Sequence, residues 1–166
     1  MLTQFSCTSI IYYLVLFNSA KLQGNILTIG IFFGLSEVIG IFLGEKVTLW
    51  FHPVKGTFIS IVFISIISLF IKLFDITEGQ LYLLFLLEVI CIGILYNMCF
   101  ILQDILITDP KLKSISFEFN FCFSLFVSMC APQLAAMIEP LPTATIWLLG
   151  FIQILSANKI SFKPTH

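Results

Sequence analysis

The stretch ILTIGIFFGLSEVIGIFL, residues 26–43, decides the fold class, because a single ionisable side chain, Glu37, interrupts an otherwise apolar run. A helix of about 20 such residues spans the hydrocarbon core of a membrane. Glu37 shares one side of this predicted helix with four glycines, which are Gly30, Gly34, Gly40 and Gly44. Because small residues let helix backbones approach closely, we expect this side to pack against other helices and to shield Glu37 from lipid.

The rest of the chain has the same apolar character. Of its 166 residues, 59% are hydrophobic and 10% are charged, so polar side chains cannot cover the surface of a water-soluble domain. The sequence predicts an all-α, multi-pass membrane helix bundle that forms a single transmembrane domain over residues 1–166. Its six expected transmembrane helices are residues 2–20, 26–43, 56–74, 81–102, 114–138 and 143–157. The first run ends in small residues, as a cleaved signal peptide would, but it lacks the preceding positive charge of such a peptide.

Lysine placement predicts how the helices are oriented in the membrane. The chain has eight lysines and no arginine. Six lysines fall on the side that holds both termini and the second and fourth loops, and two fall on the other side. Because cytoplasmic loops collect positive residues, we expect both termini to be cytoplasmic, whichever membrane the protein occupies.

Several classes of function are excluded by composition and spacing. A net charge of −1 without arginine leaves no basic footprint for nucleic acid. The five cysteines lie within apolar runs, without the spacing of metal ligands or of a disulfide framework. No nucleophile–base pair or glycine-rich phosphate loop is present. We therefore expect no enzyme activity, no cofactor, no metal and no nucleic-acid partner, and the lipid bilayer as the surroundings of the chain.

Polar side chains within the predicted helices are the candidate functional residues, since an ionisable group at the bilayer centre costs about 2.5–3.5 kcal/mol. Glu37 is either a partner for a cation or proton, or a protonated acid that hydrogen-bonds to a neighbouring helix. Tyr96 and Asn97 either line a wet cavity or join neighbouring helices. Gln133 follows a proline in mid-helix, and transporters use such breaks near their binding sites.

Five short motifs occur in order along the chain. They are Tyr12-Tyr13 with the Leu-Gln-Gly-Asn loop at 22–25, Gly34-Leu35-Ser36-Glu37, the stretch 104–107 with Lys111 and Lys113 after it, Ala131-Pro132, and Pro140-Leu141-Pro142. In this order they resemble the C-terminal six-helix half of major facilitator superfamily transporters, within the organic cation/anion transporter family. That fold has two six-helix halves with the substrate between them. The resemblance thus implies a second six-helix half, supplied by a missing N-terminal part, another copy or another subunit.

The resemblance also implies a function, the transport of a small organic solute by alternating access. The pathway would be lined by the first, second, fourth and fifth helices, with six candidate residues: Tyr12, Tyr13, Glu37, Tyr96, Asn97 and Gln133. A position at which the family often carries Asp or Arg falls near Leu125, and arginine is absent, so a cation or neutral solute is favoured over an anion. The same departures motivate an alternative, a non-transporting structural membrane subunit or degenerate half-transporter.

Overall fold

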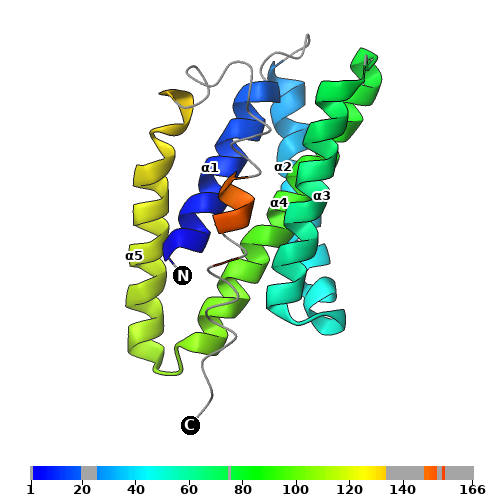
Figure 1. The fold of residues 1–166 in the computed structure, drawn as a ribbon. Coiled ribbons are helices and arrows are strands. Elements are labelled where there is room, and N and C mark those ends of the chain that lie inside the picture. Colours follow the sequence, from blue (N-terminus) through cyan, green and yellow to red (C-terminus); the bar gives the residue numbers. More distant parts are fainter. Residues whose placement is uncertain (1, 20–25, 75, 134–147, 153–154, 156–166) are drawn as a thin grey trace.

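The fold is a bundle of long helices. A computed structural model describes residues 2–19, 26–74, 76–133, 148–152 and 155. Within these residues there is no strand, and five helices follow one another: α1 (Leu2–Ser19), α2 (Ile26–Trp50), α3 (Pro53–Leu73), α4 (Glu78–Leu106) and α5 (Pro110–Ser128) (Figure 1). The all-α class predicted from the sequence is therefore confirmed.

Four helical stretches are long and apolar enough to cross a membrane: Leu27–Trp50, Pro53–Leu73, Glu78–Leu106 and Pro110–Gln133. The apolar part of α1, Leu2–Phe17, is shorter. These lengths are compatible with a multi-pass membrane protein. Of the sixth predicted helix, 143–157, the structure describes residues 148–152 and residue 155, which are helical. The predicted end of the fifth helix, 134–138, lies outside the described residues.

Prolines determine where α3 and α5 begin. Both helices start earlier than the apolar runs predict, at Pro53 and Pro110, because proline suits the first turn, where a backbone N–H has no intrahelical partner. The residue before each proline caps its helix. Asp109 accepts a backbone N–H of the first turn of α5 at 2.9 Å, and His52 Nδ1 accepts one from α3 at 3.4 Å.

Prolines also explain where α2 and α5 end. α2 runs to Trp50, past the predicted end at residue 43. It ends there because the next proline is Pro53, and residues before a proline avoid the helical conformation. The predicted fifth helix is interrupted after Ser128, because the ring of Pro132 excludes the carbonyl group four residues before it. The chain then turns and is helical again over 131–133.

The central helix of the bundle is α4 (Figure 1). Both α2 and α3 pack on α4, and α1 lies between α4 and α5. The turns from α2 to α3 and from α4 to α5 lie at one end of the bundle, which we call the α4–α5 end, and the turn from α3 to α4 lies at the opposite end. The largest fully buried apolar side chains come from three helices: Phe5, Ile11, Leu14, Ile64, Ile92, Leu95 and Met98.

The glycine face predicted for α2 exists over only part of its length. A Cβ atom placed on Gly93 of α4 would lie 3.0 Å from the Cα of Gly40 and 2.8 Å from the carbonyl oxygen of Glu37. Only a glycine fits where the two backbones meet so closely. By contrast, a Cβ atom on Gly30 or Gly34 would meet no atom of the described residues within 4 Å. The close approach is confirmed at Gly40, whereas no described residue covers Gly30 and Gly34, because crossing helices approach closely over only a few turns.

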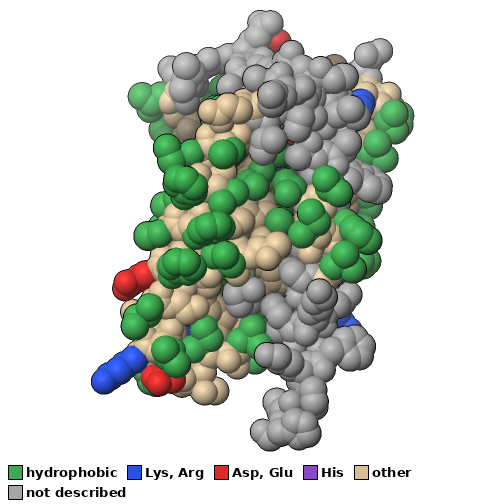
Figure 2. Space-filling model, turned by 60° about the vertical axis from the view of Figure 1, so that its left-hand side comes forward, with side chains coloured by type: hydrophobic (Ala, Val, Ile, Leu, Met, Phe, Trp, Pro, Cys, Tyr) green, Lys and Arg blue, Asp and Glu red, His purple; other side chains and the backbone are tan. Residues whose placement is uncertain are grey.

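The outer faces of α2 and α5 are apolar. On α2 the side chain of Phe42 is 66% exposed, and on α5 that of Phe126 is 69% exposed. Figure 2 shows hydrophobic side chains over much of the described surface on the face that includes α5. An apolar surface of this extent is typical of a protein that contacts lipid or another membrane helix.

Candidate functional site

Two polar side chains connect α1 to α2 inside the bundle. The Tyr12 hydroxyl donates a hydrogen bond to Oε2 of Glu37 at 3.4 Å, and both side chains are half-buried. The Glu37 carboxylate therefore faces a neighbouring helix. Its hydrogen-bond partner among the described residues is a neutral hydroxyl group.

Two further tyrosines lie around this contact. The Tyr12 ring meets the Tyr13 ring at 85° with 5.4 Å between centroids, and it meets the Tyr96 ring at 73° with 6.3 Å between centroids. The hydroxyl groups of Tyr96 and Ser9 share a hydrogen bond of 2.7 Å. Ser9 and the two α1 tyrosines are three and four residues apart, so they occupy one side of that helix. We call Tyr12, Tyr13, Glu37 and Tyr96 the tyrosine–glutamate cluster.

The tyrosine–glutamate cluster has the chemistry of a site for an organic cation. A carboxylate supplies a full negative charge, and aromatic faces attract alkylammonium groups. The cluster offers one carboxylate from α2, two phenol rings from α1 and one phenol ring from α4. A bound cation would supply the counter-charge that the hydroxyl group lacks.

An open groove of about 510 Å³ runs between α1 and the end of α5. Tyr13 of the cluster forms part of its wall on α1, and Leu125 and Pro132 form part of the opposite wall. Among the described residues, no Asp, Glu, Lys or His lines this groove. The groove thus reaches the cluster through Tyr13, and its apolar wall suits the apolar part of a solute.

Asn97 lies outside the cluster and joins two helices. Its side-chain nitrogen donates to the carbonyl oxygen of Ile41 on α2 at 2.7 Å. A Cβ atom on Gly44 would lie 2.7 Å from the Cβ of Asn97, so α2 is packed tightly against this side chain. Of the two roles predicted for Asn97, the geometry favours helix–helix bonding.

Gln133 also lies apart from the cluster. It is exposed in the short helical segment that follows α5. When its amide nitrogen faces the preceding turn, that nitrogen donates to the carbonyl oxygens of Met129 at 2.9 Å and Cys130 at 3.1 Å. The side chain thus bonds back to the backbone of the turn that separates α5 from this segment.

Two polar contacts were not predicted from the sequence. Ser9 bonds to Tyr96, and its spacing of three residues from Tyr12 was the available signal. Glu88 on α4 is 1% exposed and accepts a hydrogen bond from Ser68 on α3. Nothing in the sequence pairs these two residues, which are 20 positions apart, so their contact depends on how α3 and α4 fold together.

The described residues contain no group of three or more His, Cys, Asp or Glu side chains that could hold a metal ion. Comparison of the sequence with protein-family models and with curated proteins found no match. The geometry of the tyrosine–glutamate cluster is therefore the main support for a functional proposal.

Proposed function

We propose that this chain is one half of a membrane carrier that moves a small organic solute by alternating access, with a cation favoured and a neutral solute second. The observation that carries the proposal is the Tyr12–Glu37 contact, in which a half-buried carboxylate meets a tyrosine whose ring packs against two further tyrosines. In this proposal Glu37 is the counter-charge, and Tyr12, Tyr13 and Tyr96 provide π faces. The proposal also rests on the resemblance to the organic-ion branch of the major facilitator superfamily.

The uncovered part of α2 supports a second half as partner. Gly30 and Gly34 form a G-x-x-x-G step with open space above it, and such steps are the usual points of close contact between membrane helices. The outer faces of α2 and α5 carry exposed apolar side chains, and on α5 they adjoin the groove beside Tyr13. We propose that another six-helix half covers these faces, whether an N-terminal part, another copy or another subunit.

Lysine placement supports cytoplasmic termini. Four of the described lysines lie at the α4–α5 end of the bundle: Lys46, Lys55, Lys111 and Lys113. We expect cysteines introduced at Val47 and Ser114 to be labelled from the cytoplasm, and one at Thr77 from the opposite side. Labelling with a membrane-impermeant maleimide, in a variant without the five native cysteines, measures this. Labelling of Val47 and Thr77 from the same side would contradict the topology.

Ligand binding tests the function directly. The full chain, purified in detergent, is titrated with a fluorescent styrylpyridinium cation and with an anionic dye of similar size. We expect saturable binding of the cation and at least tenfold weaker binding of the anion, because the site carries one negative charge. Equal binding of both dyes would contradict a cation site. Absence of saturable binding would favour a non-transporting structural membrane subunit.

A further inference from the structure

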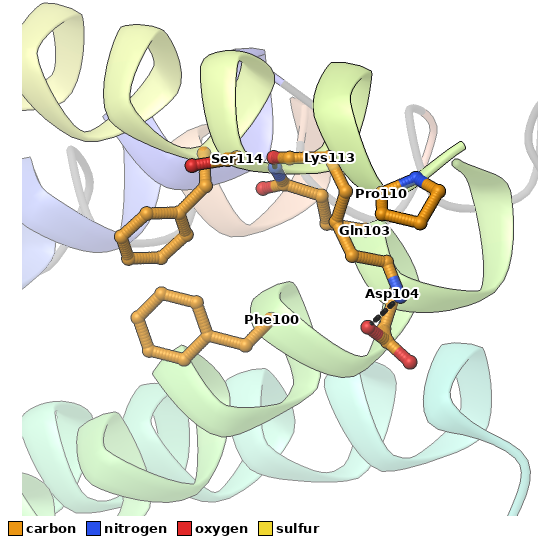
Figure 3. Close-up of a pocket in the computed structure, with 7 residues that line it drawn as sticks. Phe100, Gln103, Asp104, Pro110, Lys113 and Ser114 are labelled. Carbon is orange, nitrogen blue, oxygen red and sulfur yellow. Dashed lines mark hydrogen bonds and ion pairs between the residues drawn. The ribbon is translucent and has the colours of Figure 1, made fainter. Parts of the chain in front are cut away.

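A second groove lies between α4 and α5, next to the turn that joins them (Figure 3). Its volume is about 560 Å³ and it is open to the surroundings of the bundle. Its lining has a polar part and an aromatic part. The side chains that matter most are Asp104, Lys113, Gln103, Phe100 and Phe117.

The lining changes from charged to aromatic along the helix axes. Phe100 precedes Asp104 by four residues on α4, and Phe117 follows Lys113 by four residues on α5. The two helices run in opposite directions, so both rings lie about 6 Å further from the turn than the charges do. Their centroids are 5.3 Å apart. A membrane has the same order of layers, with charged headgroups outside and hydrocarbon within.

The charged part of the groove is electrically balanced. Asp104 and Lys113 form an ion pair (Figure 3). Their side chains are 67% and 37% exposed, so both charges can be reached from outside. A purely anionic headgroup would be attracted to Lys113 and repelled by Asp104. A zwitterionic headgroup complements both, with its phosphate at Lys113 and its ammonium group at Asp104.

Gln103 distinguishes a zwitterionic headgroup with a primary ammonium group from one with a trimethylated ammonium group. Its side chain is 2% exposed, and its nitrogen donates to the carbonyl oxygen of Lys113 at 3.4 Å. Its oxygen atom, Oε1, has no hydrogen-bond partner among the described residues. A primary ammonium group has three N–H donors for such acceptors, whereas a trimethylated one has none.

We propose that this groove binds one phospholipid with a zwitterionic, primary-ammonium headgroup, the chemistry of phosphatidylethanolamine. The phosphate contacts Lys113, the ammonium group donates to Asp104 near the Gln103 oxygen, and an acyl chain lies along Phe100 and Phe117. This site requires only that the α4–α5 end lies at a membrane surface. It does not depend on transport or on the tyrosine–glutamate cluster.

Native mass spectrometry of the full chain, delipidated in detergent, tests the proposal. The probes are phosphatidylethanolamine, phosphatidylcholine and phosphatidylglycerol with identical dioleoyl chains. We expect a single phosphatidylethanolamine adduct with at least fivefold higher occupancy than either other lipid. Equal occupancy by phosphatidylcholine, or a preference for phosphatidylglycerol, would overturn the proposal.

Three variants assign the adduct to the groove. Lys113→Gln and Asp104→Asn should each lower phosphatidylethanolamine occupancy to the phosphatidylcholine level. Lys111→Gln is the matched control. It removes the same charge two residues before Lys113, and the Lys111 side chain does not line the groove. It should leave occupancy unchanged. The altered side chains lie at the surface, and size-exclusion profiles report whether each variant is folded. Equal losses in Lys111→Gln and Lys113→Gln would overturn the proposal.

Discussion

Glutamine in place of Glu37 is expected to weaken strongly the binding and uptake of a cationic dye while leaving the protein folded. The amide has the same shape as the carboxylate and still accepts a hydrogen bond from Tyr12, so the helix contact survives. The ligand loses its only full counter-charge in the cluster. Hydrogen bonds to charged groups contribute about 1.5–3 kcal/mol, which corresponds to roughly 10–100-fold weaker binding. Dye titration of the purified chain and uptake by the reconstituted, assembled carrier measure the effect.

Glu118→Gln is the matched control for this experiment. It makes the same chemical change on α5, where Glu118 is exposed and accepts a hydrogen bond from Ser114 at 3.3 Å. We expect it to bind the dye like the unaltered chain. If Glu37→Gln binds and transports the dye normally, Glu37 is a structural acid that joins α1 to α2, and it does not belong to a binding site.

Leucine in place of Gly93 is expected to separate α2 from α4 and to destabilise the bundle. Its Cβ alone would lie 2.8 Å from the Glu37 carbonyl oxygen and 3.0 Å from the Cα of Gly40, and backbone atoms cannot move aside as a flexible side chain can. Overpacking typically costs about 1–3 kcal/mol. For a protein of this length that lowers the Tm by roughly 2–12 °C. Thermal loss of the monodisperse size-exclusion peak in detergent gives the Tm.

Gly34→Leu is the paired control for Gly93→Leu. It adds the same side chain to a glycine of α2 whose surroundings are open. In the isolated chain we expect a change in Tm of less than about 1 °C, as for ordinary surface substitutions. A Gly93→Leu variant as stable as the Gly34→Leu variant would contradict the close contact between α2 and α4.

The sequence was informative about single helices and less so about their pairing. Apolar runs located the helices, and helical spacing correctly placed Glu37 and Gly40 on a side that faces other helices. The same spacing also included Gly30 and Gly34, which no described residue covers, because periodicity defines a side of a helix but not how much of it a neighbour covers. Helix ends were predicted poorly where prolines and polar caps, rather than the apolar run, set them.

The candidate site shows the same limit. Tyr12 and Glu37 each stood out as polar groups at membrane depth, but their contact joins two helices and no spacing in one helix predicts it. Asn97 stood out for the same reason, yet it bonds to the backbone of Ile41. Which polar residues meet one another depends on the crossing of the helices, and this comes from packing over the whole bundle.

The contact between Gly40 and Gly93 has a mechanical consequence. It joins the backbones of α2 and α4, so these helices behave as one stiff body. Three side-chain hydrogen bonds attach α1 to that body, from Tyr12 to Glu37, between Ser9 and Tyr96, and between Thr8 and Cys99. Each is worth about 1 kcal/mol. A cation that takes the Oε2 atom of Glu37 displaces the Tyr12 hydroxyl from it, so occupancy of that atom changes one of the bonds that hold α1.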